Sequence, residues 1–163
     1  KFEGGVHQAP IGQIVLAFPE PIGVIGVISP DDAPLLSMVS LLSPALAMGN
    51  TVVLVPSERY PLVATDFYQV LDTSDVPAGA INFVTGSKDL LARVLAEHDD
   101  VDAVWYAGHA DLAEIIERLS IGNLKQTWVT AGQRNWADPA LGEGREFLRR
   151  ATQVKNLWMP YGE

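Results

Sequence analysis

Three sets of side chains in this sequence could do chemistry, and their spacing decides between the alternatives. His7, His98 and His109 lack the His-x-His or His-x-x-x-His spacing of a metal site, so we expect solvated or hydrogen-bonded histidines. The acidic segment 97–102 lacks the glycine and the terminal glutamate of a calcium-binding loop. The serines within residues 29–43 form no Gly-x-Ser-x-Gly elbow, which disfavours a serine hydrolase. The residues alone therefore predict neither a metal site nor a serine nucleophile.

Composition and charge exclude further classes of function. None of the 163 residues is cysteine, which rules out disulfides, thiolate metal sites and a cysteine nucleophile. Because 11 basic and 20 acidic residues give a formal net charge of −9, we expect no nucleic acid and no anionic membrane as a partner. A hydrophobic fraction of 48% indicates one folded domain with its own core rather than a disordered chain.

The start of the chain and its longest apolar stretch bear on where the protein acts. The sequence begins at Lys1, without Met and without a basic and apolar leader, which indicates a piece of a longer chain with no secretory signal. The uncharged stretch 33–57 is interrupted by Pro44, Gly49 and Asn50, so we interpret it as a buried helix followed by a buried strand. We therefore expect a cytoplasmic protein that does not enter a membrane.

Short apolar runs alternate with segments of helical spacing between residues 22 and 129, which is the pattern of βαβ units around a parallel sheet. Strands are predicted over 22–28, 51–55, 80–84, 102–106 and 126–129, and helices over 34–48, from Pro61 onward, over 89–96 and over 110–119. Asp31 and Asp32 are predicted to cap the first helix, and Gly49 and Asn50 to end it. The fold class is therefore α/β: a Rossmann-like parallel sheet of about five strands with helices on both faces.

Both ends of the chain differ from this alternating middle. Residues 8–20 have the alternation of an extended ribbon with a possible turn at Pro10 and Gly12, residues 142–150 resemble a short charged helix, and residues 152–159 resemble a strand. The predicted organisation is an N-terminal β-ribbon (1–21), a Rossmann-like domain (22–136), and a C-terminal helix with an oligomerisation strand (137–163). Exposed strands of this kind need a partner, which indicates association through added strands.

A series of segments occurs in a recognisable order along the chain. They are residues 20–24 (EPIGV), 44–54 (PALAMGNTVVL), 56–58 (PSE), 77–86 (PAGAINFVTG), 98–108 (HDDVDAVWYAG), 129–135 (VTAGQRN), 144–148 (GREFL) and 152–158 (TQVKNLW). Their order resembles the nucleotide-binding domain of aldehyde dehydrogenases joined directly to that family's C-terminal oligomerisation strand, with the thiol-bearing catalytic domain missing between. The chain thus resembles the truncated, non-catalytic C-terminal domain of the long family 16 members.

The resemblance also implies which catalytic groups are missing. The family's Pro-Trp-Asn-Phe-Pro motif reads Pro-Asp-Asp-Ala-Pro at residues 30–34, and the carboxylate of Asp32 cannot donate a hydrogen bond to an oxyanion as the asparagine amide does. Thr130 stands where the family has its general-base glutamate, and no cysteine is present to attack an aldehyde. We therefore expect no catalytic residue in this chain, and the chain alone is predicted to be inactive.

Cofactor positions are retained unevenly. Where the family has a lysine, a serine and a glycine that serve NAD, this chain has Val55, His109 and Ala113. The family positions that remain as weak cofactor-binding candidates are Glu58, Ser29 and Pro30. A carboxylate such as Glu58 at the end of a strand can accept both ribose hydroxyls, but Val55 leaves no cation beside it. No cofactor is expected, and weak NAD binding is the alternative.

Two functions remain open on the sequence. The first is a structural and oligomerisation domain of an aldehyde dehydrogenase family protein, whose complete parent would oxidise aldehydes to acids with NAD. The alternative is an NAD-binding domain that contributes to aldehyde oxidation with a separate catalytic domain. In the first case the partner is a second copy of the chain or the catalytic domain of the parent chain, reached through the terminal strands.

Overall fold

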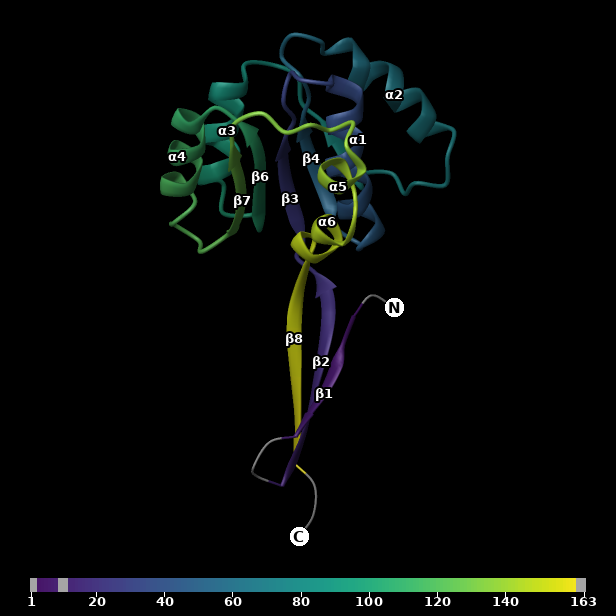
Figure 1. Cartoon of the computed structure of the whole chain (residues 1–163), viewed down its shortest axis with the longest axis vertical. Coiled ribbons are helices and arrows are strands. Elements are labelled where there is room, and N and C mark those ends of the chain that lie inside the picture. The colour runs from purple at the N-terminus through teal and green to yellow at the C-terminus, as the bar shows by residue number, and fades with distance from the viewer. Residues whose placement is uncertain (1–2, 9–11, 161–163) are drawn as a thin grey trace.

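The computed structural model describes residues 3–8 and 12–160 of the chain, and it has an α/β body from which a narrow sheet extends (Figure 1). The strands are β1 (Gly5–Gln8), β2 (Gln13–Pro21), β3 (Val24–Ile28), β4 (Thr51–Val55), β5 (Ile81–Phe83), β6 (Ala103–Gly108), β7 (Gln126–Ala131) and β8 (Thr152–Pro160). The helices are α1 (Pro34–Ala47), α2 (Leu62–Asp72), α3 (Lys88–Glu97), α4 (Ala110–Leu119), α5 (Pro139–Gly142) and α6 (Arg145–Arg150). Among the described residues, none of these helices is long and apolar enough to cross a membrane.

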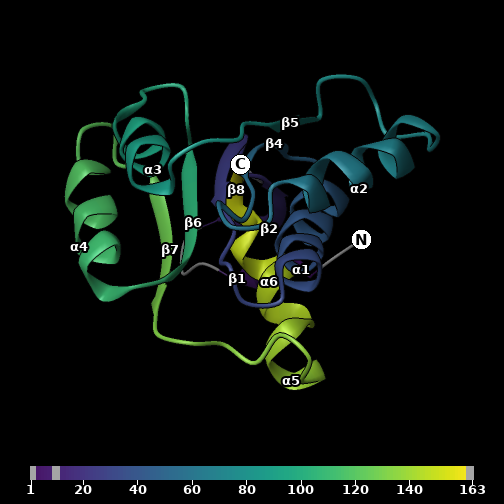
Figure 2. The ribbon, with the colours of Figure 1, turned by 90° about the horizontal axis from the view of Figure 1, so that it is seen from above.

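The main sheet consists of five parallel strands in the order β5-β4-β3-β6-β7. Helices α1 and α2 lie on one face of it and α3 and α4 on the other, as seen from above in Figure 2. This arrangement confirms the predicted Rossmann-like fold class. The chain runs outward from β3 to β5 on one side and then continues with β6 and β7 on the other. Ligands of such sheets bind at the carboxyl ends of the strands where this reversal occurs.

The apolar strand residues divide between two cores, because both faces of a central parallel strand are covered. On the α1 side, Trp105, Trp128 and Phe147 pack with Met38 and Leu42. The core under α3 and α4 is built from smaller side chains and includes Ile28, Val104, Leu95, Ile116 and Tyr106. The aromatic core on the α1 side therefore joins the main sheet to α6, near the C-terminus.

The sequence predicted the C-terminal end of α1 correctly but not its N-terminal cap. The predicted cap by Asp31 and Asp32 is wrong: the N-cap residue is Ala33, in a left-handed conformation with φ of 48°, and no side chain caps the helix. The predicted end is confirmed, because the N–H of Gly49 donates to the carbonyl of Leu46 and that of Asn50 to the carbonyl of Ala45. Gly49 has a φ of 88°, the left-handed conformation that this type of helix end requires.

The terminal sheet consists of β1, β2 and β8 in antiparallel order β1-β2-β8. The strand predicted over 152–159 is confirmed as β8. The segment predicted over 8–20 as an extended ribbon with a possible turn falls on the end of β1, at Gln8, and on β2, which begins at Gln13 and pairs antiparallel with β1. The predicted turn residue Pro10 lies outside the described residues. The charged helix predicted over 142–150 is present as α6, but it begins only at Arg145, after Gly144 in a positive-φ conformation, and Gly142 is the last residue of α5.

Candidate functional site

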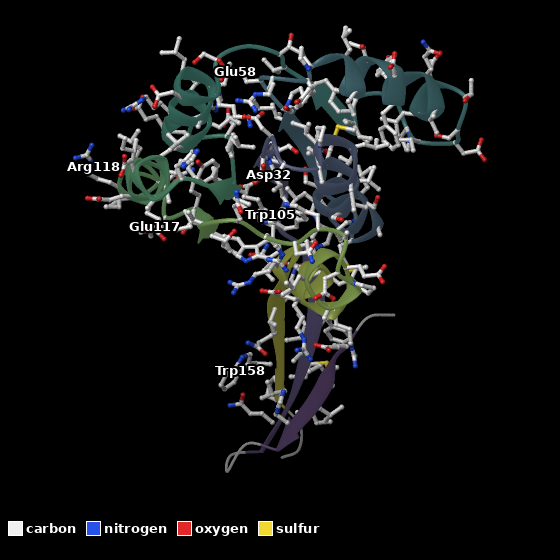
Figure 3. The ribbon with its side chains drawn as sticks, turned by 45° about the horizontal axis from the view of Figure 1, so that its top comes forward. Asp32, Glu58, Trp105, Glu117, Arg118 and Trp158 are labelled. Atoms are coloured by element: carbon white, nitrogen blue, oxygen red, sulfur yellow. The ribbon has the colours of Figure 1, made fainter. Side chains whose placement is uncertain are left out.

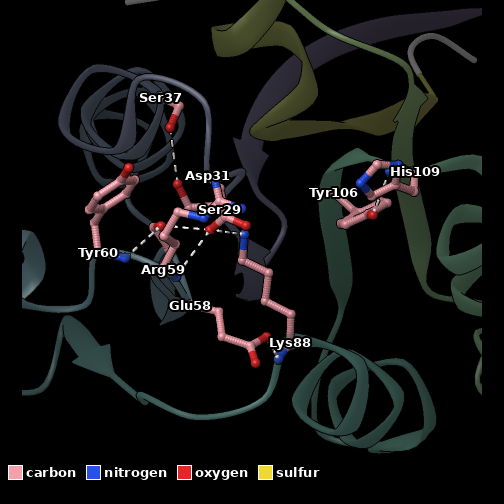
Figure 4. A network of polar contacts seen from close by, with 10 residues as sticks. Ser29, Asp31, Ser37, Glu58, Arg59, Tyr60, Lys88, Tyr106 and His109 are labelled. Atoms are coloured by element: carbon pink, nitrogen blue, oxygen red, sulfur yellow. Dashed lines mark hydrogen bonds and ion pairs between the residues drawn. The ribbon is translucent and has the colours of Figure 1, made fainter.

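The carboxyl edge of the main sheet brings together most of the residues that the sequence singled out. Because β3 and β4 are parallel neighbours, the segments that follow them, with Ser29 and Asp31 on one and Ser57 and Glu58 on the other, meet at this edge (Figure 4). Figure 3 shows Glu58 and Asp32 on the α/β body, whereas Trp158 lies on the terminal sheet. The carboxyl edge and the terminal sheet are thus two separate places where function is expected.

Asp31 is the centre of a polar network at the carboxyl edge. Its Oδ1 accepts a hydrogen bond from Ser57 Oγ at 2.6 Å and from the backbone N–H of Arg59 at 3.4 Å. The ammonium of Lys88, from the start of α3, lies 2.7 Å from the same oxygen. Ser57 Oγ also accepts from the backbone N–H of Tyr60 at 3.1 Å. These contacts explain why Asp31 does not cap α1: its carboxylate ties the end of β3 to the segment after β4 and to α3.

The charge state of Asp31 follows from this network. Partial burial raises the pKa of the Asp31 carboxyl, but hydrogen bonds from Lys88 and Ser57 and the charge of Lys88 outweigh it and lower this pKa from 3.8 to about 2. Asp31 is therefore ionised at neutral pH, where its carboxylate and the Lys88 ammonium form an ion pair.

Acid is expected to remove the stabilisation that Asp31 provides. Since the folded state binds this proton less readily than the unfolded chain, the contribution is present above about pH 4 and is lost as the pH falls through about 2. Urea unfolding of the protein and of Asp31→Asn between about pH 5 and pH 2 measures it. The difference in free energy of unfolding should shrink by about 1 kcal/mol, a figure reduced for solvent screening because the Asp31 side chain is 40% exposed. A difference that stays constant over this range contradicts the expectation.

Glu58 is exposed, and its Oε2 accepts the backbone N–H of Lys88, the first residue of α3, at 2.9 Å. Its carboxylate thus stabilises the start of a helix. Sequence reasoning missed Lys88, which brings an ammonium to the carboxyl edge although β4 itself ends at the apolar Val55. Its position in the sequence could have indicated it: Lys88 comes directly after the turn that follows β5, and the carboxyl end of β5 lies at the same edge of the sheet.

Ser29 and Pro30, the other candidate cofactor residues, follow β3 directly. The hydroxyl of Ser29 is fully buried and lies 3.2 Å from the hydroxyl of Ser37 on α1. The backbone N–H of Ser29 donates to the carbonyl of Val55 at 2.9 Å, which extends the pairing of β3 with β4. Pro30 is half-buried. Ser29 therefore has a structural role, and a cofactor role for Ser29 and Pro30 stays a prediction.

Tyr106 lies on β6, two residues before the strand ends at Gly108, and pairs in register with Ile28 of β3. Tyr106 is 6% exposed, and its hydroxyl accepts the backbone N–H of His109, the N-cap residue of α4, at 2.8 Å. The hydroxyl lies so close to the turn that a Cβ added at Gly108 would be only 2.4 Å from it, so no larger residue fits there. Burial raises the pKa of Tyr106, which keeps this hydroxyl neutral. The first N–H at the start of α4 is therefore already bonded within the chain.

The positions aligned with catalytic residues do not form a substrate site. Asp32 is exposed, and Thr130 on β7 borders a cavity of only about 10 Å³. The Arg134 guanidinium lines this cavity and lies 5.4 Å from the ring centre of Trp136 and 4.9 Å from that of Phe147. A space of that size holds roughly one water molecule. Within the described residues, no group of three or more His, Cys, Asp or Glu could hold a metal ion.

Comparison with known proteins gives a consistent relationship. Residues 2–137 match the family model described as the aldehyde dehydrogenase family. The chain is 44% identical over 116 residues to 2-hydroxymuconic semialdehyde dehydrogenase of Pseudomonas putida, a match that covers 71% of this chain and 24% of that protein. It is 33% identical over 136 residues to the NADP/NAD-dependent aldehyde dehydrogenase PuuC of Escherichia coli strain K12, covering 83% of this chain and 28% of that protein. The chain thus spans about a quarter of the length of the curated relatives it matches.

Solved structures agree with this relationship. PnpE from Pseudomonas sp. WBC-3 superimposes with a TM-score of 0.76 at 33% identity, over 80% of this chain and 27% of that one. A lactaldehyde dehydrogenase superimposes with a TM-score of 0.77 at 29% identity, over 82% of this chain and 28% of that one. The similarity therefore extends from the sequence to the arrangement of the strands and helices.

Proposed function

This chain belongs to the aldehyde dehydrogenase family, and we propose that it serves there as a non-catalytic structural and oligomerisation domain. The proposal rests on the terminal sheet. In the complete parent protein, the oxidation of aldehydes with NAD would be carried by a separate domain that bears the nucleophile, since this chain contains no cysteine. The alternative, an NAD-binding domain, rests on Glu58, whose carboxylate already accepts the N–H at the start of α3.

One face of the terminal sheet is mostly apolar. Directly paired residues of antiparallel strands lie on the same face, and Val6, Leu16 and Leu157 are paired in this way across β1, β2 and β8. With the alternate residues of the same strands, this face, here called the apolar face, carries Val6, Ile14, Leu16, Phe18, Leu157 and Met159. It also carries four polar or charged residues, which are Gln8, Glu20, Gln153 and Lys155. Val6 is 71% exposed and Leu157 is 41% exposed. An exposed apolar face of this kind favours association.

The free edge of the terminal sheet indicates where a partner strand would be added. Within the described residues, β8 pairs with β2 on one side only, so its other side offers backbone N–H and C=O groups to a further strand. Lys155 is the single charged residue of β8, and its ammonium lies 3.3 Å from Glu20. Strand addition at β8, with the apolar face covered, is therefore the proposed mode of contact with a second copy or with the parent's catalytic domain.

The expected assembly is a homodimer, with a mass in light scattering at micromolar concentration of twice the 17.6 kDa of one chain. Leu157→Lys should make the protein monomeric, because an unpaired ammonium on the buried apolar face costs several kcal/mol and weakens association by about a hundredfold or more. Val154→Lys is the matched control: Val154 is equally part of β8 but lies on the opposite face, and this variant should remain a dimer.

The outcomes separate the two partners. A monomeric wild-type chain that binds the catalytic domain of its parent, with the binding lost in Leu157→Lys, supports docking within the parent protein. A monomer with no affinity for that domain contradicts the proposal. A Leu157→Lys variant that stays dimeric also contradicts the proposal. Circular dichroism of Leu157→Lys and Val154→Lys checks that both variants are folded.

A further inference from the structure

Three hydrogen-bond donors converge on a single oxygen at the carboxyl edge. The Ser57 hydroxyl, the Arg59 N–H and the Lys88 ammonium come from two separate segments of the chain, and all of them face Oδ1 of Asp31. A hydroxyl, an N–H and an ammonium directed at one point are the groups that hold an anion in proteins. In this chain the anion is a side chain of the protein itself.

These donors are held in place by contacts other than those with Asp31. Ser57 is 2% exposed, and its hydroxyl oxygen accepts the N–H of Tyr60. The backbone of Lys88 is fixed by Glu58 at the start of α3, and the Lys88 side chain is only 14% exposed. Without the Asp31 carboxylate, a partly buried ammonium and a buried hydroxyl would remain directed at the same space, and an ammonium there without a counter-charge is unfavourable.

One further donor at the same edge, the backbone N–H of His109, is also occupied. Helix N-termini at the carboxyl ends of parallel strands are where dinucleotide phosphates bind in related folds. At the start of α4, the Tyr106 hydroxyl accepts the His109 N–H at 2.8 Å. The groups described at this edge therefore do not fit a dinucleotide such as NAD: phosphates placed there would meet the carboxylate of Asp31, and the His109 N–H, a donor that they would need, is already bonded to Tyr106.

We propose that Asp31 is a built-in anion that occupies a phosphate-type site formed by Ser57, Arg59 and Lys88, and that it closes the carboxyl edge of the sheet to nucleotides. The site takes inorganic phosphate or a phosphomonoester once the carboxylate is removed. This inference stands independently of the assembly through the terminal sheet, because the two lie in different parts of the molecule (Figure 3).

Calorimetric titration of Asp31→Ala with inorganic phosphate tests the proposal. The wild-type protein should show no binding up to about 10 mM phosphate, whereas Asp31→Ala should bind at least about tenfold more tightly, with a constant near 1 mM. Adding Lys88→Met to Asp31→Ala should abolish this binding. Asp32→Ala, which removes the exposed neighbouring carboxylate, is the matched control and should behave as the wild type. Asp31→Ser serves as a second opening variant if Asp31→Ala does not fold.

The other outcomes of these titrations support or contradict the proposal that Asp31 is a built-in anion. Folded Asp31→Ala or Asp31→Ser without phosphate binding overturns it, as does binding that persists after Lys88→Met. ADP should bind Asp31→Ala no more tightly than phosphate does, because the Tyr106 hydroxyl still holds the His109 N–H at the start of α4. Micromolar binding of ADP to the wild-type protein, lost in Glu58→Ala, would show that the edge is open and would overturn the proposal.

Discussion

Replacing Asn50 with alanine is expected to lower the free energy of unfolding by about 4 kcal/mol, one of the two largest effects we expect from a single substitution. Asn50 is 4% exposed, and its Oδ1 accepts the backbone N–H groups of Ile22 at 2.7 Å and Gly23 at 3.0 Å. Its Nδ2 donates to the carbonyls of Ala45 and Ala151, both at 2.9 Å. Alanine leaves several of these groups without their partner in a region that water does not reach.

Urea unfolding of wild type and variant measures this loss. Asn82→Ala is the matched control, because Asn82 is exposed and its side chain makes one bond, to the carbonyl of Gly79, so its loss should stay below about 0.5 kcal/mol. Asn50→Asp keeps the two accepted bonds but not the two donated ones, and it should fall between the wild type and Asn50→Ala. A loss of less than about 1 kcal/mol in Asn50→Ala would show that the four bonds do not act together.

The position of Asn50 links its stability effect to the proposed function. Ile22 follows β2 directly, and Ala151 directly precedes β8. The amide therefore fixes both strands of the terminal sheet at the point where they leave the α/β body (Figure 1). A sheet that must present one apolar face to a partner gains from such a fixed base, because a partner then meets a preorganised surface.

Much of the α/β body could be predicted because its signals are local. The strand over Thr51–Val55 and the helix over Ala110–Leu119 have the predicted bounds, since an uninterrupted apolar run and a helical period are both contained within the segment itself. The end of α1 at Gly49 is equally local, because only glycine adopts its backbone conformation without strain.

The remaining features depend on contacts between distant segments, which a single sequence does not display. Asp31 and Lys88 are 57 residues apart, and Asn50 and Ala151 are 101 residues apart. The carboxylate of Asp31 fits the pattern of a helix cap, and only the tertiary arrangement of β4 and α3 shows that stronger donors compete for it. The aromatic surroundings of Arg134 were likewise not predicted, because Trp128, Trp136 and Phe147 come from three separate segments.

Trp128→Ala is expected to lower the free energy of unfolding by about 4 to 5 kcal/mol. Trp128 is 7% exposed, and its ring packs edge-on against Trp105 and Phe147, with ring centres 5.1 Å apart in both pairs. The guanidinium groups of Arg134 and Arg150 each lie 5.6 Å from its centre. Alanine removes both aromatic contacts, leaves two cations without this ring, and creates a cavity where α6 meets the main sheet.

The consequence for α6 distinguishes this substitution from a general loss of stability. Phe147 on α6 contacts the main sheet through Trp128, so the amide hydrogens of α6 should exchange faster in Trp128→Ala than the loss of global stability alone explains. The amide hydrogens of α4, on the opposite face, should exchange faster only by the amount that this global loss explains. Trp158→Ala is the control with the same change in side chain: Trp158 is 60% exposed, and in a monomeric Leu157→Lys background its loss should stay below about 0.5 kcal/mol. Equal losses at Trp128 and Trp158, or unchanged exchange in α6, would show that α6 does not depend on the ring of Trp128 for its contact with the main sheet.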